Sequence, residues 1–320
     1  MTRAAELLGV AFPIVQAPIG SSSTAELAAA VSNTGGLGML TGTWRSPEGL
    51  RALIQRTRAL TQRPFGVNLV LAFDIGAQLR ASLDAGVRII SFSWGDPAPW
   101  VSTVQQAGGV VVHSAGSGVE AGHAAAAGVD VLVAQGVEAG GHVLGTTPLQ
   151  QLLPDIRRAA PAVPLLAAGG IGDVAAARRA LEAGANGIWL GSRFVASVEA
   201  AAHPDYKQRV VDATSRDTVL STVFDIGWPD APHRTIRNST LRAWEASGRP
   251  PTGTRPGEGE VVARHRDGRP VVRYEDTPPL EGMTGDLEAL PLYAGESVDT
   301  ISEVLPAATI VERFHAAFHQ

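Results

Sequence analysis

A glycine-rich segment that carries one histidine offers this chain's best candidate for chemistry. Residues 135–147 read QGVEAGGHVLGTT and follow directly on the apolar run of residues 131–134. Glycines let main chain come close to a flat or phosphorylated ligand, and the imidazole of His142 should titrate near neutrality. We therefore predict a reaction site here, with His142 as its catalytic residue. The alternative is a loop histidine that only caps main-chain groups.

The composition excludes several other kinds of active site. The chain of 320 residues contains no cysteine, which rules out disulfides, thiolate nucleophiles, zinc–thiolate sites and cysteine-ligated iron–sulfur clusters. Lys207 is the single lysine and lies in a polar stretch, so an enzyme that forms a Schiff base is disfavoured. We predict no metal site.

The net charge and hydropathy of the chain indicate which partners the protein binds and where in the cell it is found. A net charge of -5 and a pI near 5.9 give no basic excess with which to displace counterions from nucleic acid. The amino terminus lacks the apolar stretch of a signal peptide, and no sustained run of about 18 strongly apolar residues occurs. We therefore expect a cytoplasmic protein that binds small molecules, with neither nucleic acid nor membrane as a partner. A homodimer is compatible with the sequence.

The elements that must position His142 form a regular alternation. Apolar runs of strand length occur at residues 13–18, 36–40, 65–70, 87–92, 109–112, 129–134, 164–168 and 187–190. Between them lie alanine-rich segments with helical spacing, at residues 25–31, 47–60, 75–83, 100–106, 119–126, 149–159 and 174–181. Near-continuous apolar strands indicate a parallel sheet covered on both faces, and eight such units close most naturally into a (β/α)8 barrel. An open doubly wound sheet is the alternative.

The alternation stops after about residue 213. Residues 247–259 are turn and linker material, and residues 261–274 predict a hairpin that turns at Asp267-Gly268. We expect a short helix at residues 238–246 and a terminal helix within 302–318, with Pro306 limiting its regular part to the residues after it. The expected organisation is a barrel over 1–212, a small C-terminal lid over 213–290, and a segment 291–320 that packs back on the barrel.

The carboxyl ends of barrel strands supply the site, so the residues there can be assigned roles. The amides of Gln16, Asn68 and Gln135 can hydrogen-bond a polar heterocycle without adding charge. The loops after the seventh and eighth strands have the glycines that hold a phosphate on main-chain N–H groups. A phosphate at one end and neutral amides at the other suggest FMN. The residues expected to contact it are Ala17, Pro18, Ile19, Asn68, Gln135, Gly140, Gly141, Gly169, Gly170, Gly191 and Ser192.

These motifs together resemble the FMN-dependent nitronate monooxygenases, formerly called 2-nitropropane dioxygenases, which share their fold with flavin-type enoyl-ACP reductases. The matching pieces lie in family order at residues 13–18, 35–38, 66–69, 138–142, 168–172 and 187–193. By this resemblance, His142 corresponds to the family's catalytic or substrate-positioning histidine. Three positions depart from the pattern: Gln135 stands where some relatives carry an acid, His113 near where some place a lysine, and Glu296 in place of a commoner glutamine.

The resemblance implies oxidation of an alkyl nitronate, or of a nitroalkane, with dioxygen to a carbonyl compound and nitrite. The principal alternative is an NAD(P)H-dependent FMN reductase that acts on a quinone or enoyl substrate. A cofactor-free phosphosugar isomerase or a metal-dependent lyase would need strand-end carboxylates or lysines that are mostly lacking here. A flavin-binding protein without catalysis would leave His142 without a purpose.

Four further residues have simpler interpretations. We expect His113 to make a structural hydrogen bond at a strand end, and Glu138 to be solvated or paired with an arginine. Trp94 and Trp100 could equally line a substrate pocket or pack in the core.

Overall fold

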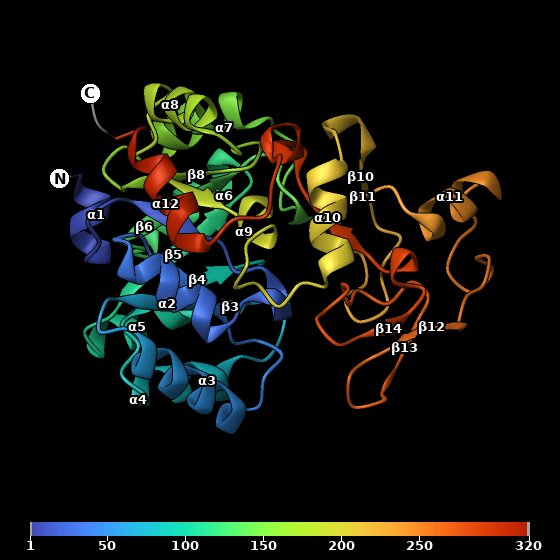
Figure 1. Ribbon diagram of the computed structural model, residues 1–320. Helices are drawn as coiled ribbons and strands as arrows, with labels where there is room; N and C mark the ends of the chain where they lie inside the picture. The colour runs from blue at the N-terminus through green and yellow to red at the C-terminus, as the bar shows by residue number, and fades with distance from the viewer. Residues whose placement is uncertain (1, 319–320) are drawn as a thin grey trace.

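A computed structural model describes residues 2–318 and shows a barrel of parallel strands with a smaller lid beside it (Figure 1). The strands pair in the order β1-β9-β8-β6-β5-β4-β3-β2. Their bounds are β1 (Ile14–Gln16), β2 (Gly38–Thr41), β3 (Phe65–Val70), β4 (Ile89–Ser93), β5 (Val110–Ala115), β6 (Val131–Gln135), β8 (Leu165–Ala168) and β9 (Gly187–Leu190).

The barrel closes between its first and second strands through main-chain hydrogen bonds. The N–H of Leu37 donates to the carbonyl of Ile14 at 2.9 Å, and the N–H of Gln16 donates to the carbonyl of Leu37 at 3.0 Å. This close approach requires glycine at position 36, where a Cβ atom would lie 2.7 Å from the Ile14 carbonyl oxygen. The (β/α)8 barrel is confirmed, and the open doubly wound sheet is wrong.

Helices cover the outside of the barrel, as the alternation in the sequence predicts. Each predicted helix is present, with ends that differ by no more than two residues: α2 (Ala25–Asn33), α3 (Pro47–Leu60), α4 (Gly76–Asp84), α5 (Ala98–Gln106), α6 (Gly118–Ala126), α7 (Leu149–Ala159) and α8 (Val174–Glu182). Three were not predicted: α1 (Arg3–Leu8), α9 (Ser192–Val195) and α10 (Pro204–Asp212). Within residues 2–318, no helix combines the length and apolar character needed to cross a membrane.

The core has two layers that follow the alternation of strand side chains. In β5, Val111 packs in the cluster that includes Ala121 and Ala124 of α6, whereas Val112 packs with Met39 and Leu166 of other strands. Because successive side chains point to opposite faces, one set fills the barrel interior and the other seats the helices.

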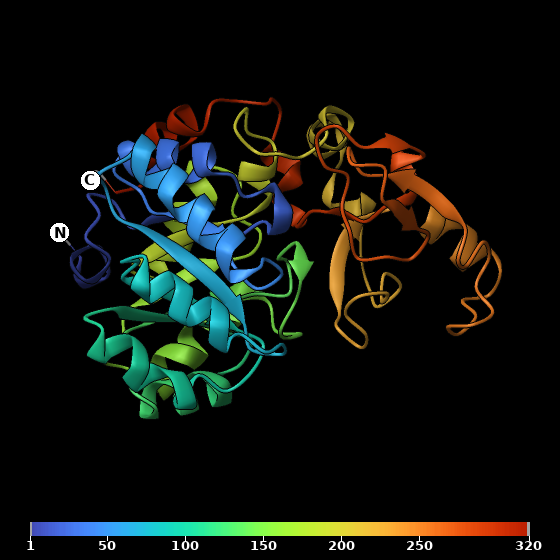
Figure 2. The ribbon, with the colours of Figure 1, turned by 90° about the horizontal axis from the view of Figure 1, so that it is seen from below.

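The lid contains two small antiparallel sheets and lies at one end of the barrel (Figure 2). The first joins β10 (Thr218–Ser221), β11 (His233–Ile236), β15 (Leu292–Tyr293) and β7 (Gly141–His142), and the second joins β12 (Val261–Arg264), β13 (Pro270–Val272) and β14 (Thr284–Gly285). The hairpin predicted at Asp267-Gly268 is present, with Gly268 at φ 85°. The predicted short helix is α11 (Ser239–Ala246), capped by the Asn238 side chain.

The last helix returns to the barrel. Helix α12 (Ala307–His315) begins directly after Pro306 and packs against α2, α8 and α9. Because β15 pairs with β11, part of segment 291–320 also contributes to the lid sheet. The division of the chain into 1–212, 213–290 and 291–320 stays a proposal.

Candidate active site

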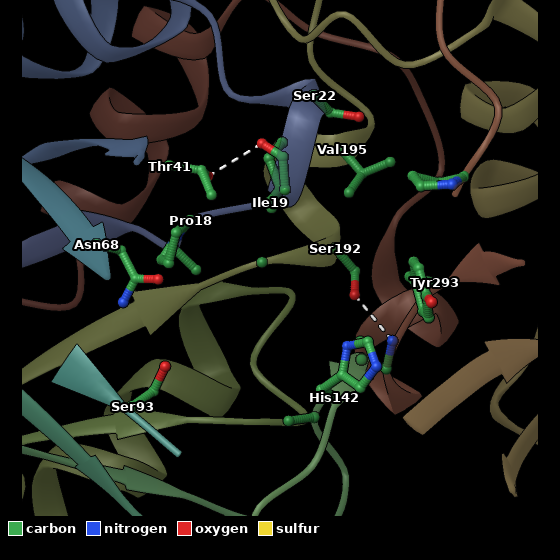
Figure 3. A pocket seen from close by; sticks show the side chains of 18 of the residues that line it. Pro18, Ile19, Ser22, Thr41, Asn68, Ser93, His142, Ser192, Val195 and Tyr293 are labelled. Carbon is green, nitrogen blue, oxygen red and sulfur yellow. Dashed lines mark hydrogen bonds between the residues drawn. The ribbon is translucent and has the colours of Figure 1, made fainter. Parts of the chain in front are cut away.

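The carboxyl ends of the barrel strands and the lid enclose a cavity of about 510 Å³. Every residue predicted for the site except Gln16 lines this one cavity, although the residues come from loops far apart in the sequence. Figure 3 shows Asn68 and Ser93 on the side of the barrel strands, with His142 and Tyr293 across the cavity from them. The structure therefore brings the predicted residues together, and their individual roles stay predictions.

His142 is held by hydrogen bonds of the main chain and of one amide side chain. It lies in β7, whose partner strand β11 places His233 opposite it. The Nε2 of Gln135 donates to the carbonyl oxygen of His142 at 3.1 Å, and the Oε1 of Gln135 accepts from the N–H of Leu144 at 2.8 Å. Since both ends of this amide are bonded to the loop, Gln135 positions His142.

The other two amides have different surroundings. Gln16 is fully buried and bonds to the main chain of Ala17 and Met39, so the expectation that it would contact a ligand is wrong. The Nδ2 of Asn68 donates to the hydroxyl of Ser91 at 3.2 Å, which leaves its Oδ1 without a hydrogen bond within residues 2–318. Asn68 therefore offers one hydrogen-bond acceptor to a ligand.

His142 does not titrate near neutrality, contrary to the expectation from the sequence. Burial, and to a smaller extent the nearby His233, lower the pKa of His142 to about 3. The ring is therefore neutral at physiological pH. Its Nε2 atom is buried and makes no hydrogen bond within residues 2–318, so it is an unsatisfied polar atom beside the cavity.

Aromatic side chains cover the imidazole. The ring of Trp228 stacks on His142 with centroids 4.1 Å apart, and Tyr293 lies 5.6 Å away. Trp94 meets His142 edge to face at 6.1 Å and adopts φ 61°, a left-handed conformation that is strained for tryptophan. Trp94 thus lines the cavity, whereas Trp100 packs against the core.

Glycines at one end of the cavity leave main-chain N–H groups that could bind an anion. Gly169 and Gly170 have φ of 106° and 67°, in the region that side chains avoid. Within residues 2–318, the main-chain N–H groups of Gly169, Gly170 and Gly191 make no hydrogen bond. Three unpaired donors at the ends of two neighbouring strands suit a phosphate group.

Comparison with known proteins identifies the family. A family model described as nitronate monooxygenase matches residues 1–79 and 71–316. The chain belongs to the nitronate monooxygenase family. It is therefore an enzyme of a family of flavin oxidoreductases, as the sequence motifs predict.

Proteins similar to this nitronate monooxygenase family member include some named as monooxygenases and some named as dehydrogenases. A Pseudomonas aeruginosa protein named nitronate monooxygenase is 34% identical over 273 residues, which cover 69% of this chain and 77% of the relative. A Mycobacterium tuberculosis protein is also 34% identical, over 251 residues that cover 78% of this chain and 69% of the relative. Its name is (3aS,4S,5R,7aS)-5-hydroxy-7a-methyl-1-oxo-octahydro-1H-indene-4-carboxyl-CoA dehydrogenase.

Solved structures match nearly the whole chain. A variant of FabK from Thermotoga maritima has a TM-score of 0.83 at 30% identity, covering 99% of this chain and 96% of that one. A nitroalkane oxidase from Streptomyces ansochromogenes has a TM-score of 0.79 at 29% identity, covering 99% of this chain and 97% of that one. The lid is thus shared with these proteins as well as the barrel.

The structure shows the contacts of three residues of this nitronate monooxygenase family member that the sequence analysis singled out, and two of them, Glu138 and His113, differ from the interpretation given there. Both carboxylate oxygens of Glu138 accept from the N–H of Leu149 at 3.0 and 3.1 Å, so Glu138 caps α7. His113 is buried outside the cavity, because its neighbour Ser114 points inward, and its Nδ1 atom lacks the expected hydrogen bond. Glu296 forms an ion pair with Arg234 of β11 at 3.2 Å.

The cavity also has a wall that sequence reasoning missed. Trp228, Asp276, Tyr293 and the hairpin residues His265 and Arg269 line it from the lid. They come from short strands and loops, where no periodic pattern indicates which side chains face the barrel. The sequence gives the types of these side chains, but it does not indicate that they line the same cavity.

Proposed function

We propose that this protein binds FMN and oxidises alkyl nitronates with dioxygen to a carbonyl compound and nitrite. The observation that carries the proposal is the neutral imidazole of His142, with a free Nε2 atom, in the same cavity as three unpaired main-chain N–H groups. The imidazole suits a hydrogen bond to the nitro group of a substrate, and the N–H groups suit a phosphate.

The cavity fits the proposed cofactor in size and in its donors. Its volume of about 510 Å³ lies within the range of about 300 to 1,000 Å³ that is usual for ligand pockets. Gly169, Gly170 and Gly191 would hold the phosphate, and the Oδ1 of Asn68 would accept a hydrogen bond from the flavin ring. Ala17, Pro18, Ile19, Gly140, Gly141 and Ser192 line the rest of the proposed site.

His142 is the residue proposed to bind the reacting group. In the tautomer that carries its proton on Nε2, the neutral ring donates a hydrogen bond to a nitronate oxygen. Trp228 and Tyr293 enclose the ring and keep water from it, which strengthens that hydrogen bond. Bound FMN would supply the electron transfer from nitronate to dioxygen.

Anaerobic mixing tests the proposal. The purified protein should be yellow, and propionate-3-nitronate without any nicotinamide should rapidly reduce its flavin by one or two electrons, which changes the visible absorption spectrum. A colourless protein with no extractable FMN would overturn the proposal. The spectrum of the same sample after addition of NADH or NADPH supplies the comparison.

The reductase alternative is supported by two findings, the dehydrogenase name of the Mycobacterium tuberculosis relative and the similarity to the FabK structure. An NAD(P)H-dependent enzyme could use the same FMN site on a quinone or enoyl substrate. Loss of the flavin absorbance with NADH or NADPH, and none with the nitronate, would select this alternative. Comparing flavin reduction by the nitronate with flavin reduction by NADH or NADPH therefore distinguishes the two reactions.

A further inference from the structure

A carboxyl group from the lid faces the cavity that holds His142. Asp276 lines this cavity, and its position is fixed because both of its main-chain polar groups are bonded. Its N–H donates to the carbonyl of Ile226 at 3.0 Å, and its carbonyl accepts from the hydroxyl of Tyr293 at 3.0 Å. The carboxyl group packs against Gly227, where a Cβ atom would lie 2.6 Å from Oδ1 of Asp276.

The carboxyl oxygens of Asp276 bond to no other residue in the part of the chain that the structure describes. Among residues 2–318, the donor that reaches them is the residue's own main-chain N–H, and no cationic side chain forms an ion pair with them. Asp276 is half-buried at the cavity wall, so a carboxylate that bonds to no neighbouring residue there is open to a ligand. Burial, and to a smaller extent the neighbouring Glu275, raise the pKa of Asp276 to about 6.

Asp276 and His142 both contact Tyr293. The ring of Tyr293 is 5.6 Å from the ring of His142, while its hydroxyl bonds to the main chain of Asp276. The two cavity residues differ in basicity, since the pKa of His142 is lowered to about 3. A group with so low a pKa takes up a proton poorly at neutral pH, whereas the carboxylate is well matched to that task.

We propose that Asp276 is the general base that removes the α-proton of a neutral nitroalkane in this cavity, so that the enzyme forms nitronates as well as oxidising them. This inference rests on the proposed function. The C–H bond breaks, its electron pair forms the C=N bond of the nitronate, and the proton moves to a carboxylate oxygen of Asp276. The negative charge passes from the carboxylate to the nitronate, so the net charge of the cavity is unchanged. Solvent then takes the proton from Asp276.

Other ionisable groups lie near Asp276, and their titration must be distinguished from that of Asp276. Glu275 is adjacent, with its carboxylate bonded to the N–H of Val272 and the hydroxyl of Thr277. Tyr293 stays neutral because burial raises its pKa, as it does for Tyr206 behind it. From the hairpin, His265 and Arg269 line the cavity, and burial lowers the pKa of His265.

The test compares a neutral nitroalkane with its preformed anion in the FMN-loaded enzyme. Asp276→Asn should lower kcat/KM for nitroethane by about 100-fold or more, the usual contribution of a general base. Ethyl nitronate, which needs no deprotonation, should be oxidised by the same variant within about threefold of the wild type. Asp276→Glu should restore part of the activity with nitroethane. Retained FMN absorbance in both variants shows that they are folded.

The pH profile with nitroethane gives a second readout. In the wild type, kcat/KM should rise with pH through an apparent pKa near 6, because the carboxylate form is the active one. This rise should be absent in Asp276→Asn, displaced to lower pH in Glu275→Gln, and kept in His265→Gln. A rise that disappears in His265→Gln and persists in Asp276→Asn would overturn the assignment.

Two further outcomes contradict the inference in distinguishable ways. Equal loss of nitroethane and ethyl nitronate oxidation in Asp276→Asn would show a structural role. A wild-type enzyme that oxidises ethyl nitronate and leaves nitroethane untouched would remove the general base and leave the proposed function standing. Failure with both compounds would overturn the proposed function itself.

Discussion

The indole of Trp228, a lid residue, stacks on the imidazole of His142 with ring centroids 4.1 Å apart and an angle of 26° between the planes. The barrel supplies the histidine, and the lid supplies the apolar cover that desolvates it. Because burial is the main cause of the low pKa of His142, the protonation of this barrel residue depends on the lid.

Removal of this cover should change the titration of His142. In Trp228→Ala the imidazole becomes accessible to water, so its pKa should rise from about 3 toward 6.5. Trp228→Phe keeps an apolar ring in place and should leave the pKa low. The measurement is NMR titration of labelled histidine, with the His142 signal identified by its absence in His142→Gln. An unchanged pKa in Trp228→Ala would show that the lid does not control it.

Loss of the imidazole itself should separate binding from turnover. His142→Ala should retain bound FMN, because the proposed cofactor contacts lie on other residues, and should lose most nitronate oxidation, by about 100-fold. His123→Ala is the matched control, since His123 is exposed on α6 and lies outside the cavity. Wild-type turnover in His142→Ala would remove the residue from the mechanism. Steady-state kinetics and the flavin spectrum supply both readouts.

The barrel could be predicted from the sequence because its signals are local. Each strand is a short apolar run buried on both faces, and the helix between two strands has its own spacing. Strand ends then meet at one edge of the sheet, which places Asn68 and Gly170 at one cavity without any knowledge of their contacts.

The fine structure of the site could not be predicted, because it depends on distant partners. Gln16 and Gln135 are the same residue type at similar strand ends, yet each bonds to the main chain that its own surroundings leave unpaired. The pKa of His142 depends on burial, to which Trp228 of the lid contributes. Such contacts follow from the register of short lid strands, for which the sequence has no periodic signal.

A close approach of two main-chain segments should make Gly140 irreplaceable. A Cβ atom there would lie 2.3 Å from the N atom of Gly295 and 2.4 Å from the carbonyl carbon of Ala294, so Gly140→Ala must displace one segment. The shift would disturb the hydrogen bond from the Gly295 N–H to Ser192 at 2.8 Å and should weaken FMN binding. We expect a loss of about 1 to 3 kcal/mol in unfolding free energy.

Gly122→Ala is the control for that change. Gly122 lies within α6, where the nearest atom to an added Cβ is 3.8 Å away. This variant should keep FMN and gain up to about 1 kcal/mol in unfolding free energy, because alanine favours the helix. Chemical denaturation and FMN titration of both variants check the pair. Wild-type FMN affinity in Gly140→Ala would show that the segments adjust without cost.

Three buried histidines should make the protein sensitive to acid. Burial is the first cause of the lowered pKa in each case, to about 4 for His113, about 3 for His142 and about 4 for His233, against 6.5 in the unfolded chain. Between pH 6.5 and about 4 the unfolded state therefore binds more protons at these sites than the folded state. Asp276 opposes this below pH 6, since its raised pKa of about 6 lets the folded state hold one additional proton.

The balance favours the unfolded state as the pH falls, because three sites outweigh one. Unfolding free energy should decrease from pH 6.5 to pH 4 by about 1 to 3 kcal/mol per pH unit and be nearly constant above pH 7. Urea denaturation across this range measures the slope. His113→Gln should reduce the slope because one proton-binding site is lost from the unfolded chain. His123→Gln, at an exposed position, should leave it unchanged. An identical slope in His113→Gln and wild type would exclude His113 as a source of the acid sensitivity.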